Sequence, residues 1–381
     1  MTTKRSFQNN SYDLICFSHL RWDFVYQRPQ HLFTRFARDR RVFFIEEPIF
    51  GDDGPRFEVS KREGELLVVQ PRLPHGTDID AVMPDLIGSL RAENEIGECV
   101  LWFYTPMMLP WADAIEPAAI VYDSMDELSM FKGAPPQLLA REKDLFARAD
   151  VVFTGGQSLY EAKRDKHHSV HAFPSSIDAS HFEQALTIEN EPEDQRAIAH
   201  PRIGFCGVID ERTDIDLLER IAELRPDWQF VMLGPVAKID EADLPRQGNI
   251  HYLGSRNYKD LPAYIGGWDV AMMPFALNDS TRFISPTKTP EYLAAGRPVV
   301  STPIHDVVRP YGEKGLVHIA ATAEEFVDAI EKAMSEDSET RRAKAAEFLS
   351  TMSWDKTQGA MAELINEVIQ EKTVEASAAH V

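Results

Sequence analysis

A lysine and a glutamate three residues apart, Lys288 and Glu291, stand at the start of an expected short helix that ends at Gly296, before a buried strand. A cation beside the positive end of a helix dipole costs about 0.3 kcal/mol or more unless an anion is near. Helix N-termini and lysines both bind phosphate groups, and the glutamate could accept hydrogen bonds from sugar hydroxyls. The pair therefore predicts a site for a phosphorylated sugar. The alternative is a surface pair on an ordinary crossover helix.

The exact start of this helix has two solutions in the sequence. Ser285 could cap it with Pro286 in the first helical position, or Thr289 could cap it with Pro290 there. The first start puts the lysine and the glutamate on one face of the helix. The second puts the glutamate in the first turn and the lysine just outside.

The surrounding segment carries a longer pattern, Ser285-Pro286-x-Lys288-x-x-Glu291-Tyr292-Leu293-Ala294-x-Gly296-x-Pro298-Val299-Val300. It resembles the donor-binding signature of bacterial GT-B glycosyltransferases, nearest to the family-4-like group that builds exopolysaccharides and cell-envelope glycans. In that family the lysine contacts the nucleotide diphosphate and the glutamate hydrogen-bonds the ribose. The resemblance implies these roles for Lys288 and Glu291, with Ser285 and Thr287 beside them in the donor site.

The resemblance implies a GT-B fold: two tandem Rossmann-like, doubly wound α/β domains, an interdomain cleft and a C-terminal helix that crosses back. It also implies an activity, the transfer of a hexose from a UDP- or GDP-sugar to a glycan or lipid-linked acceptor in exopolysaccharide or cell-envelope synthesis. Positive side chains would do the work that a metal ion does in other glycosyltransferases. We therefore expect no metal and no cofactor, the nucleotide sugar being a substrate.

A second donor-binding stretch follows an expected strand at Gly204-Phe205-Cys206-Gly207. Small residues at a strand end let a ligand approach the backbone, although many such turns bind nothing. The family places a glycine-rich turn and an arginine here, against the diphosphate, so the resemblance implies donor binding by Gly207 and Arg212. The family's following lysine is absent: the next lysine in the chain is Lys238.

One departure leaves the stereochemistry open. Family-4 enzymes carry a second glutamate eight residues before the one that matches Glu291, and here that position is Phe283. In this respect the sequence is similar to the xanthan glucuronosyltransferase group, which inverts the anomeric centre, whereas family 4 retains it.

Carboxylates cluster after another expected strand, in Val121-Tyr122-Asp123-Ser124-Met125-Asp126-Glu127. An inverting transferase needs a base to take the proton of the attacking acceptor hydroxyl. Asp126 is the first candidate for that base and Asp123 the second. The alternative is that these carboxylates cap a helix or pair with basic side chains.

The loop after the first expected strand is rich in aromatic and hydrogen-bonding groups, which suit a sugar surface. We expect it to bind the acceptor through Arg21, Trp22, Gln27 and Arg28. The helix that follows mixes arginines with phenylalanines, which leaves a peripheral contact with an anionic membrane open. An ordinary crossover helix with core phenylalanines is favoured over that contact.

Composition narrows the class of protein. A chain of 381 residues with 44% hydrophobic residues suggests two globular domains. A net charge of −21 argues against a nucleic-acid partner. The polar first ten residues lack the apolar core of a leader, and no run is long and apolar enough to span a membrane. The three cysteines fall in apolar runs and match no zinc site. We expect a cytoplasmic protein, with peripheral binding at the inner face of the plasma membrane left open.

Short apolar runs, such as the expected strand Val42–Ile45, alternate with helical stretches twice along the chain, which predicts two parallel sheets covered on both faces. We expect an acceptor domain at 1–186, an acidic linker at 187–201, a nucleotide-sugar domain at 202–350, and a crossover helix and tail at 351–381, the tail frayed from residue 371. The DxD strings at Asp78 and Asp214 precede expected helices, so we interpret them as caps and not as metal sites.

The sequence leaves two other functions open. One is a nucleotide-sugar epimerase of GT-B fold, which would form product from the donor alone. The other is a catalytically silent carbohydrate- or membrane-binding subunit, to which the absence of a glutamate at Phe283 lends slight support.

Overall fold

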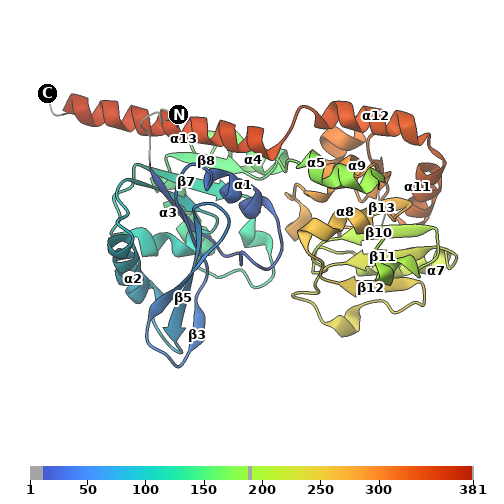
Figure 1. Cartoon of the computed structure of the whole chain (residues 1–381), viewed down its shortest axis with the longest axis horizontal. Coiled ribbons are helices and arrows are strands. Elements are labelled where there is room, and N and C mark those ends of the chain that lie inside the picture. Colours follow the sequence, from blue (N-terminus) through green and yellow to red (C-terminus); the bar gives the residue numbers. More distant parts are fainter. Residues whose placement is uncertain (1–11, 188–190, 380–381) are drawn as a thin grey trace, which may run out of the picture.

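The computed structural model describes residues 12–187 and 191–379. The predictions for the first ten residues, for positions 188–190 of the linker and for the last two residues lie outside these ranges. Within them the chain forms two α/β halves side by side, with one long helix laid across the first (Figure 1). This confirms the predicted fold class.

The first half is built on one large sheet. Its strands are β1 (Asp13–Phe17), β2 (Val42–Ile45), β3 (Ile49–Gly51), β4 (Arg56–Lys61), β5 (Leu66–Pro74), β6 (Cys99–Phe103), β7 (Ala119–Ser124), β8 (Val151–Thr154) and β9 (Val170–Ala172). They lie in the order β3-β5-β2-β1-β6-β7-β8-β9, with β4 antiparallel on β5 and the other pairs parallel. The crossover helices are α1 (Arg28–Phe36), α2 (Ile79–Glu93), α3 (Leu138–Arg148) and α4 (Gln157–Lys163).

The second half repeats the plan with a smaller sheet. Its strands are β10 (Arg202–Cys206), β11 (Gln229–Leu233), β12 (Ile250–Gly254), β13 (Val270–Met273), β14 (Val299–Ser301) and β15 (His318–Ile319), in the order β12-β11-β10-β13-β14-β15 and all parallel. Its helices include α7 (Ile215–Leu224), α8 (Leu261–Ile265), α9 (Lys288–Ala294), α10 (His305–Val307), α11 (Ala323–Ser335) and α12 (Ser338–Leu349). Two short helices, α5 (Ala179–Phe182) and α6 (Glu193–Arg196), join the halves.

The sheet order explains where a ligand can bind. Strand order reverses beside β1 in the first sheet and beside β10 in the second. In doubly wound sheets the loops at such a reversal part from each other and leave a crevice at the carboxyl ends of the strands. Both crevices open toward the boundary between the halves, as the predicted interdomain cleft requires.

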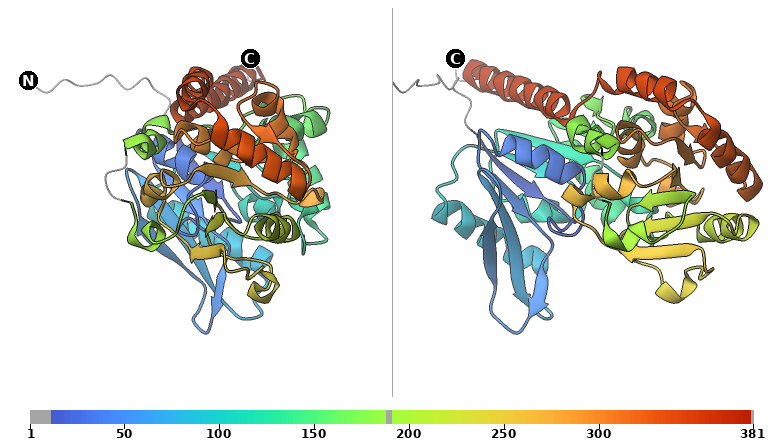
Figure 2. Two further views of the ribbon diagram at one scale, coloured as in Figure 1. Left: turned by 90° about the vertical axis from the view of Figure 1, so that its right-hand side faces the viewer. Right: turned by 45° about the vertical axis from the view of Figure 1, so that its right-hand side comes forward.

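The last helix, α13 (Trp354–Ala379), crosses back onto the first domain, as predicted (Figures 1 and 2). Its apolar stripe, including Met361 and Ile365, packs in the same core as Phe33 and Phe36 of α1. The expectation of a frayed tail from residue 371 is wrong as far as Ala379, because the helix continues that far. The sequence from residue 371 is rich in Ala and Glu and holds no Gly or Pro to stop a helix.

Two local predictions also need correction. The helix that carries the signature begins at Lys288 with Thr287 as its N-cap, so neither predicted start is right. Both Lys288 and Glu291 are helical, and Pro290 is the third helical residue, in the first turn, where its ring is tolerated. Strands β3 and β4 were not predicted, because β3 has only three residues and β4 is mostly exposed, so neither leaves a buried apolar run in the sequence.

Candidate active site

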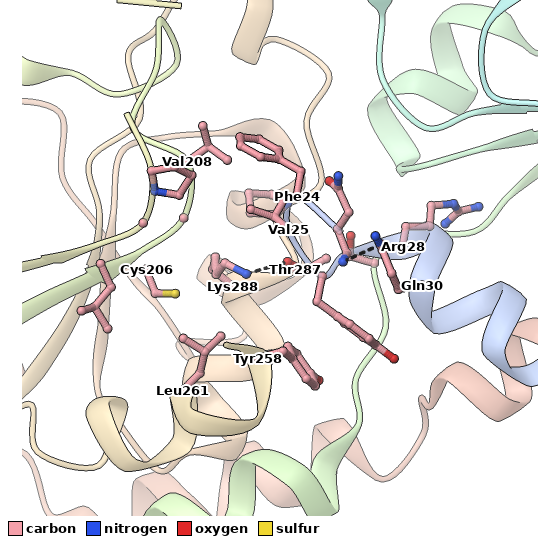
Figure 3. A pocket seen from close by; sticks show the side chains of 18 of the residues that line it. Phe24, Val25, Arg28, Gln30, Cys206, Val208, Tyr258, Leu261, Thr287 and Lys288 are labelled. Atoms are coloured by element: carbon pink, nitrogen blue, oxygen red, sulfur yellow. Dashed lines mark hydrogen bonds between the residues drawn. The ribbon is translucent and has the colours of Figure 1, made fainter. Parts of the chain in front are cut away.

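A cavity of about 400 Å³ lies between the two domains, at the carboxyl ends of their strands. The first domain lines it with the loop 22–30 and with the segments after β7 and β8. The second lines it with the segments after β10, β11 and β12 and with 284–288. In Figure 3, Lys288 and Cys206 of the second domain lie across the cavity from Phe24 and Val25 of the first-domain loop.

The lysine and glutamate of the signature form an ion pair at the floor of this cavity. Lys288 Nζ lies 2.9 Å from Glu291 Oε2 and 3.3 Å from Thr287 Oγ1. The Lys288 side chain is 17% exposed and lines the cavity, whereas that of Glu291 is 4% exposed and lies behind it. The ammonium group is therefore the part of the pair that a ligand in the cavity can reach.

Burial sets the protonation of this pair. Burial raises the pKa of Glu291, and the charge of Lys288 opposes the rise without cancelling it. Burial also acts to lower the pKa of Lys288, but Glu291 and Cys206 together outweigh it, so the pKa of Lys288 is raised. Lys288 is therefore a cation at neutral pH, as phosphate binding requires.

The other donor candidates surround this pair. Ser285, Thr287 and Gly207 all line the cavity. Ser285 also contacts the first domain: its carbonyl oxygen accepts a hydrogen bond from Ser175 Oγ at 2.5 Å. A Cβ on Gly234 would lie 1.8 Å from the carbonyl oxygen of Gly207, so the turns after β10 and β11 pack too closely for a side chain there.

Arg212 lines the cavity and is fixed by a carboxylate of its own loop. Its Nε and a terminal nitrogen contact Asp210 Oδ1 and Oδ2 at 3.0 and 2.7 Å. A fork-to-fork pair of this kind holds the guanidinium in one orientation while leaving further N–H groups to donate. Arg212 is thus a second positive group facing the cavity beside Lys288.

The first domain lines the cavity with two carboxylates, Asp23 and Asp126. Asp23 pairs with Arg62 at 2.6 Å, whereas Asp126 has no salt bridge among the described residues. Burial raises its pKa, and the charges of Arg212 and Arg28 oppose that rise. A carboxyl with a raised pKa is a stronger base than an ordinary aspartate once it is ionised. Its position across the cavity from the signature lysine is that of a base facing a donor.

Asp123, the second candidate base, lies differently. Its two oxygens accept hydrogen bonds from Arg28 Nε and a terminal Arg28 nitrogen at 3.0 and 2.9 Å, and its side chain is fully buried. Arg28 donates once more to the carbonyl oxygen of Phe173, at 2.7 Å. This ion pair occupies both oxygens of Asp123, so the geometry favours Asp126 as the base and gives Asp123 a structural role.

Three contacts fix the backbone around Asp126. The Asp123–Arg28 pair holds its N-terminal side. A Cβ on Gly155 would lie 2.3 Å from the carbonyl oxygen of Met125, so β8 and this loop meet backbone to backbone. Lys163, which is fully buried, holds the other side through Glu127 Oε2 at 2.9 Å.

The predicted acceptor residues divide into two groups. Trp22, Gln27 and Arg28 line the cavity. Arg21 does not: it donates to Glu46 Oε2 at 3.0 Å and to the carbonyl oxygen of Glu47 at 2.6 Å, outside the cavity. The prediction of acceptor binding by Arg21 is thus unsupported by its position, because one carboxylate and the carbonyl oxygens of Glu47 and Pro48 hold its guanidinium against the β2–β3 segment.

Sequence reasoning missed an aromatic contact that closes one end of the cavity. Tyr26 of the first domain stacks on Tyr258 of the second, with ring centroids 4.3 Å apart. Tyr258 also stacks on His181, again at 4.3 Å. Tyr26 stands within the aromatic loop that the sequence singled out, but nothing in the sequence marks Tyr258.

Lys238 also lies near the cleft. Its Nζ sits 4.9 Å from the ring centroid of Phe131, which the Arg212 guanidinium also approaches at 5.7 Å. Phe131 belongs to the first domain, so it joins the two halves beside Asp126. Burial lowers the pKa of nearby His19 to about 4, helped by the charge of Lys238.

The structure also shows the positions of the DxD aspartates, which the sequence analysis interpreted as helix caps. Asp78 and Asp214 accept hydrogen bonds from Ala81 N and Leu217 N, three residues on, as helix caps do. Across the described ranges, no three His, Cys, Asp or Glu side chains are grouped as metal ligands would be. No helix in the described part of the chain has the length and apolarity needed to cross a bilayer.

Comparison with known proteins agrees with this geometry. Residues 200–336 match the family model described as "Glycosyl transferases group 1". The chain is 24% identical over 298 residues to the Bacillus subtilis (strain 168) protein described as "Putative teichuronic acid biosynthesis glycosyltransferase TuaH", covering 71% of this chain and 72% of that one.

Solved structures extend the likeness to the whole fold. A sucrose-phosphate synthase from Thermosynechococcus elongatus superposes with a TM-score of 0.70 at 13% identity, covering 94% of this chain and 100% of that one. An E. coli structure described as "Trehalose-6-phosphate … bound with UDP-2-fluoro glucose" gives 0.66 at 13% identity, covering 93% and 99%. The protein has the GT-B fold, and most of its second domain, residues 200–336, matches the group 1 glycosyltransferase model. The predicted resemblance is confirmed.

Proposed function

We propose that this glycosyltransferase moves a sugar from a nucleotide-diphosphate donor, a UDP- or GDP-sugar, to a glycan or lipid-linked acceptor in cell-envelope polysaccharide synthesis. The observation that carries the proposal is the position of Lys288, a cation at the floor of the interdomain cavity with Arg212 beside it and Asp126 opposite. The name of the Bacillus subtilis relative supports the acceptor class. The UDP sugar bound to the E. coli neighbour supports the donor class.

Each wall of the cavity has its own part in the proposed reaction. Lys288 and Arg212 donate to the diphosphate and stabilise the negative charge that grows on it as the glycosidic bond breaks. Glu291 lies behind Lys288 and holds its ammonium group at the cavity, a position that does not favour the ribose contact implied by the resemblance. With these positive groups in place, the reaction needs neither a metal ion nor a cofactor.

Asp126 takes the proton of the attacking hydroxyl, because it is the first-domain carboxylate at the cavity that no described basic side chain pairs with, Asp23 being paired with Arg62. Trp22, Gln27 and Arg28 hold the acceptor. The protein acts in the cytoplasm, at the inner face of the membrane when its acceptor is lipid-linked. A base in this position serves an inverting reaction, and NMR of the product's anomeric proton reports the stereochemical outcome directly.

Thermal denaturation with UDP, GDP, ADP or TDP, each at millimolar concentration with EDTA present, tests the donor site. We expect one diphosphate to raise the Tm of the wild type and to leave that of Lys288→Ala unchanged. Stabilisation in EDTA also tests metal independence of binding. A chain that responds to none of the four contradicts the proposed donor site. Product that forms from donor without acceptor contradicts the transfer reaction.

A further inference from the structure

A second hollow, of about 510 Å³, lies on the second domain away from the interdomain cleft. His200 and Pro201 precede β10, Asp269 precedes β13, and Pro298 precedes β14, and all four line it. The hollow is therefore at the amino ends of the parallel strands, whereas the donor site is at their carboxyl ends. Helix α12, which runs along the top of the second domain in Figure 1, forms one wall of the hollow. A ligand here would be separate from the donor.

Three arginines line this hollow: Arg297, Arg341 and Arg342. Their hydrogen bonds go to carbonyl oxygens: Arg297 to Trp268 at 2.8 Å, Arg341 to Gly296 at 2.9 Å, and Arg342 to Ser338 at 3.0 Å. Part of their donor capacity thus ties down the ends of nearby helices. Each guanidinium has five N–H groups, so several remain to donate to a ligand.

Carboxylates in the hollow do not neutralise these arginines. Asp269 Oδ2 accepts from His200 Nδ1 at 2.7 Å and from the backbone N of Arg202 at 2.6 Å. Glu336 Oε1 lies 2.8 Å from His318 Nε2. Among the described residues, none of the three arginines lies within 4.0 Å of a carboxylate oxygen.

The positive charges of these three arginines repel one another and are partly buried. Burial lowers the pKa of Arg297, the charges of Arg341 and Arg342 lower it further, and Asp269 opposes them without cancelling them. Burial likewise lowers the pKa of Arg341, and Glu336 opposes this while Arg342 adds to it. Such a gathering of unpaired cations in a chain with a net charge of −21 would be relieved by a bound anion.

We propose that this hollow is a binding site for a phosphate-type oxyanion, held by the guanidinium forks of Arg297, Arg341 and Arg342. Guanidinium groups match the oxygens of a tetrahedral phosphate bidentately, which a lysine cluster would not. The volume admits a phosphate group with part of the molecule that carries it. The anion is either a soluble phosphate compound or the phosphate of a lipid headgroup, since both present the same oxygens.

Calorimetric titration of inorganic phosphate at low salt, into a Lys288→Met background that weakens the donor site, tests the first source. We expect the further change Arg341→Ala/Arg342→Ala to weaken phosphate binding at least tenfold and Arg341→Lys/Arg342→Lys to weaken it less. Arg164→Ala is the matched control, because Arg164 is exposed on the first domain and pairs with no carboxylate in the described structure. It should bind phosphate as its parent does.

Flotation with phosphatidylglycerol vesicles, against phosphatidylcholine vesicles, tests the second source in the wild-type chain. Flotation that is lost in Arg341→Ala/Arg342→Ala assigns the site to a lipid phosphate. Phosphate binding without flotation assigns it to a soluble ligand. The proposal is overturned if the Lys288→Met chain does not bind phosphate and the wild type does not float, or if the alanine variants bind both probes as well as their parents do. Because donor-site binding is not scored, failure here leaves the proposed transfer reaction untouched.

Discussion

The two walls of the interdomain cavity present charges of opposite sign: the second domain presents cations and the first domain a carboxylate. On the second domain, Lys288 is paired with Glu291 but keeps its ammonium group at the cavity surface, and Arg212 is steered there by Asp210. On the first domain, Asp123 is sealed by Arg28, and Asp126 alone of the two aspartates reaches the cavity.

This difference teaches how a site can separate binding from proton transfer. Paired cations on one wall keep their charge at all physiological pH values, as an anchor for phosphate needs. The carboxylate on the other wall has its pKa raised by burial, so that it is a competent base. The account therefore expects substitutions on one wall to change donor affinity and those on the other to change turnover.

The largest effect should follow Asp126→Asn. Asparagine keeps the size of the side chain but cannot accept a proton, so we expect the turnover number to fall by about 10²–10⁴-fold. Steady-state release of the nucleotide diphosphate, with the donor and acceptor that the wild type uses, measures it. A variant that retains more than a third or so of wild-type turnover would remove Asp126 from the chemistry.

The same variant carries a signature in pH. The pKa of Asp126 is raised above the ordinary 3.8. On acidification, the wild-type rate should therefore begin to fall at a higher pH than it would with an ordinary aspartate as the base. The variant should lose this acid limb of the pH–rate profile. A carboxyl whose pKa is raised by folding favours the folded state only when protonated; that contribution is lost as pH rises through the folded pKa. Asp126→Asn should thus be at least as stable as the wild type at pH 7, with the advantage disappearing in acid.

Asp123→Asn should do the reverse. It leaves the buried Arg28 guanidinium without its counter-ion, which costs roughly 3–5 kcal/mol of unfolding free energy. Urea denaturation measures the loss. A loss below about 1 kcal/mol would show that the pair is not a structural anchor, and would return Asp123 to the list of candidate bases.

Lys288→Met should weaken binding of the nucleotide diphosphate by roughly 10–100-fold, the value of one or two charge-assisted hydrogen bonds. Calorimetric titration with the diphosphate reports it. The change also strands Glu291, so Lys288→Met/Glu291→Gln is the matched variant in which no buried charge is left alone. Equal affinity in the double variant and the wild type would exclude the lysine as a phosphate ligand.

The smallest effect should come from Glu127→Ala, which frees one side of the Asp126 loop. Lys163 keeps Glu142 at 2.6 Å, so the fold should hold. We expect turnover to fall about tenfold, as small misplacements of a reacting group do, with diphosphate affinity unchanged. Glu127→Gln keeps an acceptor for Lys163 and should lie near the wild type. If alanine and glutamine behave alike, the Lys163 contact does not position the loop.

Much of the fold could be predicted because parallel strands buried on both faces leave apolar runs in the sequence. Strand β2, for example, was predicted with its observed bounds, Val42–Ile45. The exposed strand β4 leaves no such run, so it could not be found. The helical tail of α13 was missed because a polar segment gives no packing signal even where its helix propensity is high.

Part of the candidate site could be predicted from the sequence and part could not. Lys288 and Glu291 are one helical turn apart, so their meeting follows from spacing alone. Asp123 and Asp126 could not be told apart in the sequence, since the arginine that seals Asp123 is 95 residues away along the chain. The stack of Tyr26 on Tyr258 likewise depends on the fold, not on any local pattern.

The central claim is that the second-domain wall binds the diphosphate and the first-domain wall transfers the proton. Its most direct test is calorimetric titration of Asp126→Asn and of Lys288→Met/Glu291→Gln with the nucleotide diphosphate that stabilises the wild type. The account predicts wild-type affinity in the first variant, despite its lost turnover, and a loss of at least tenfold in the second. Equal losses of affinity in both variants would contradict it, because the two walls would then share one function.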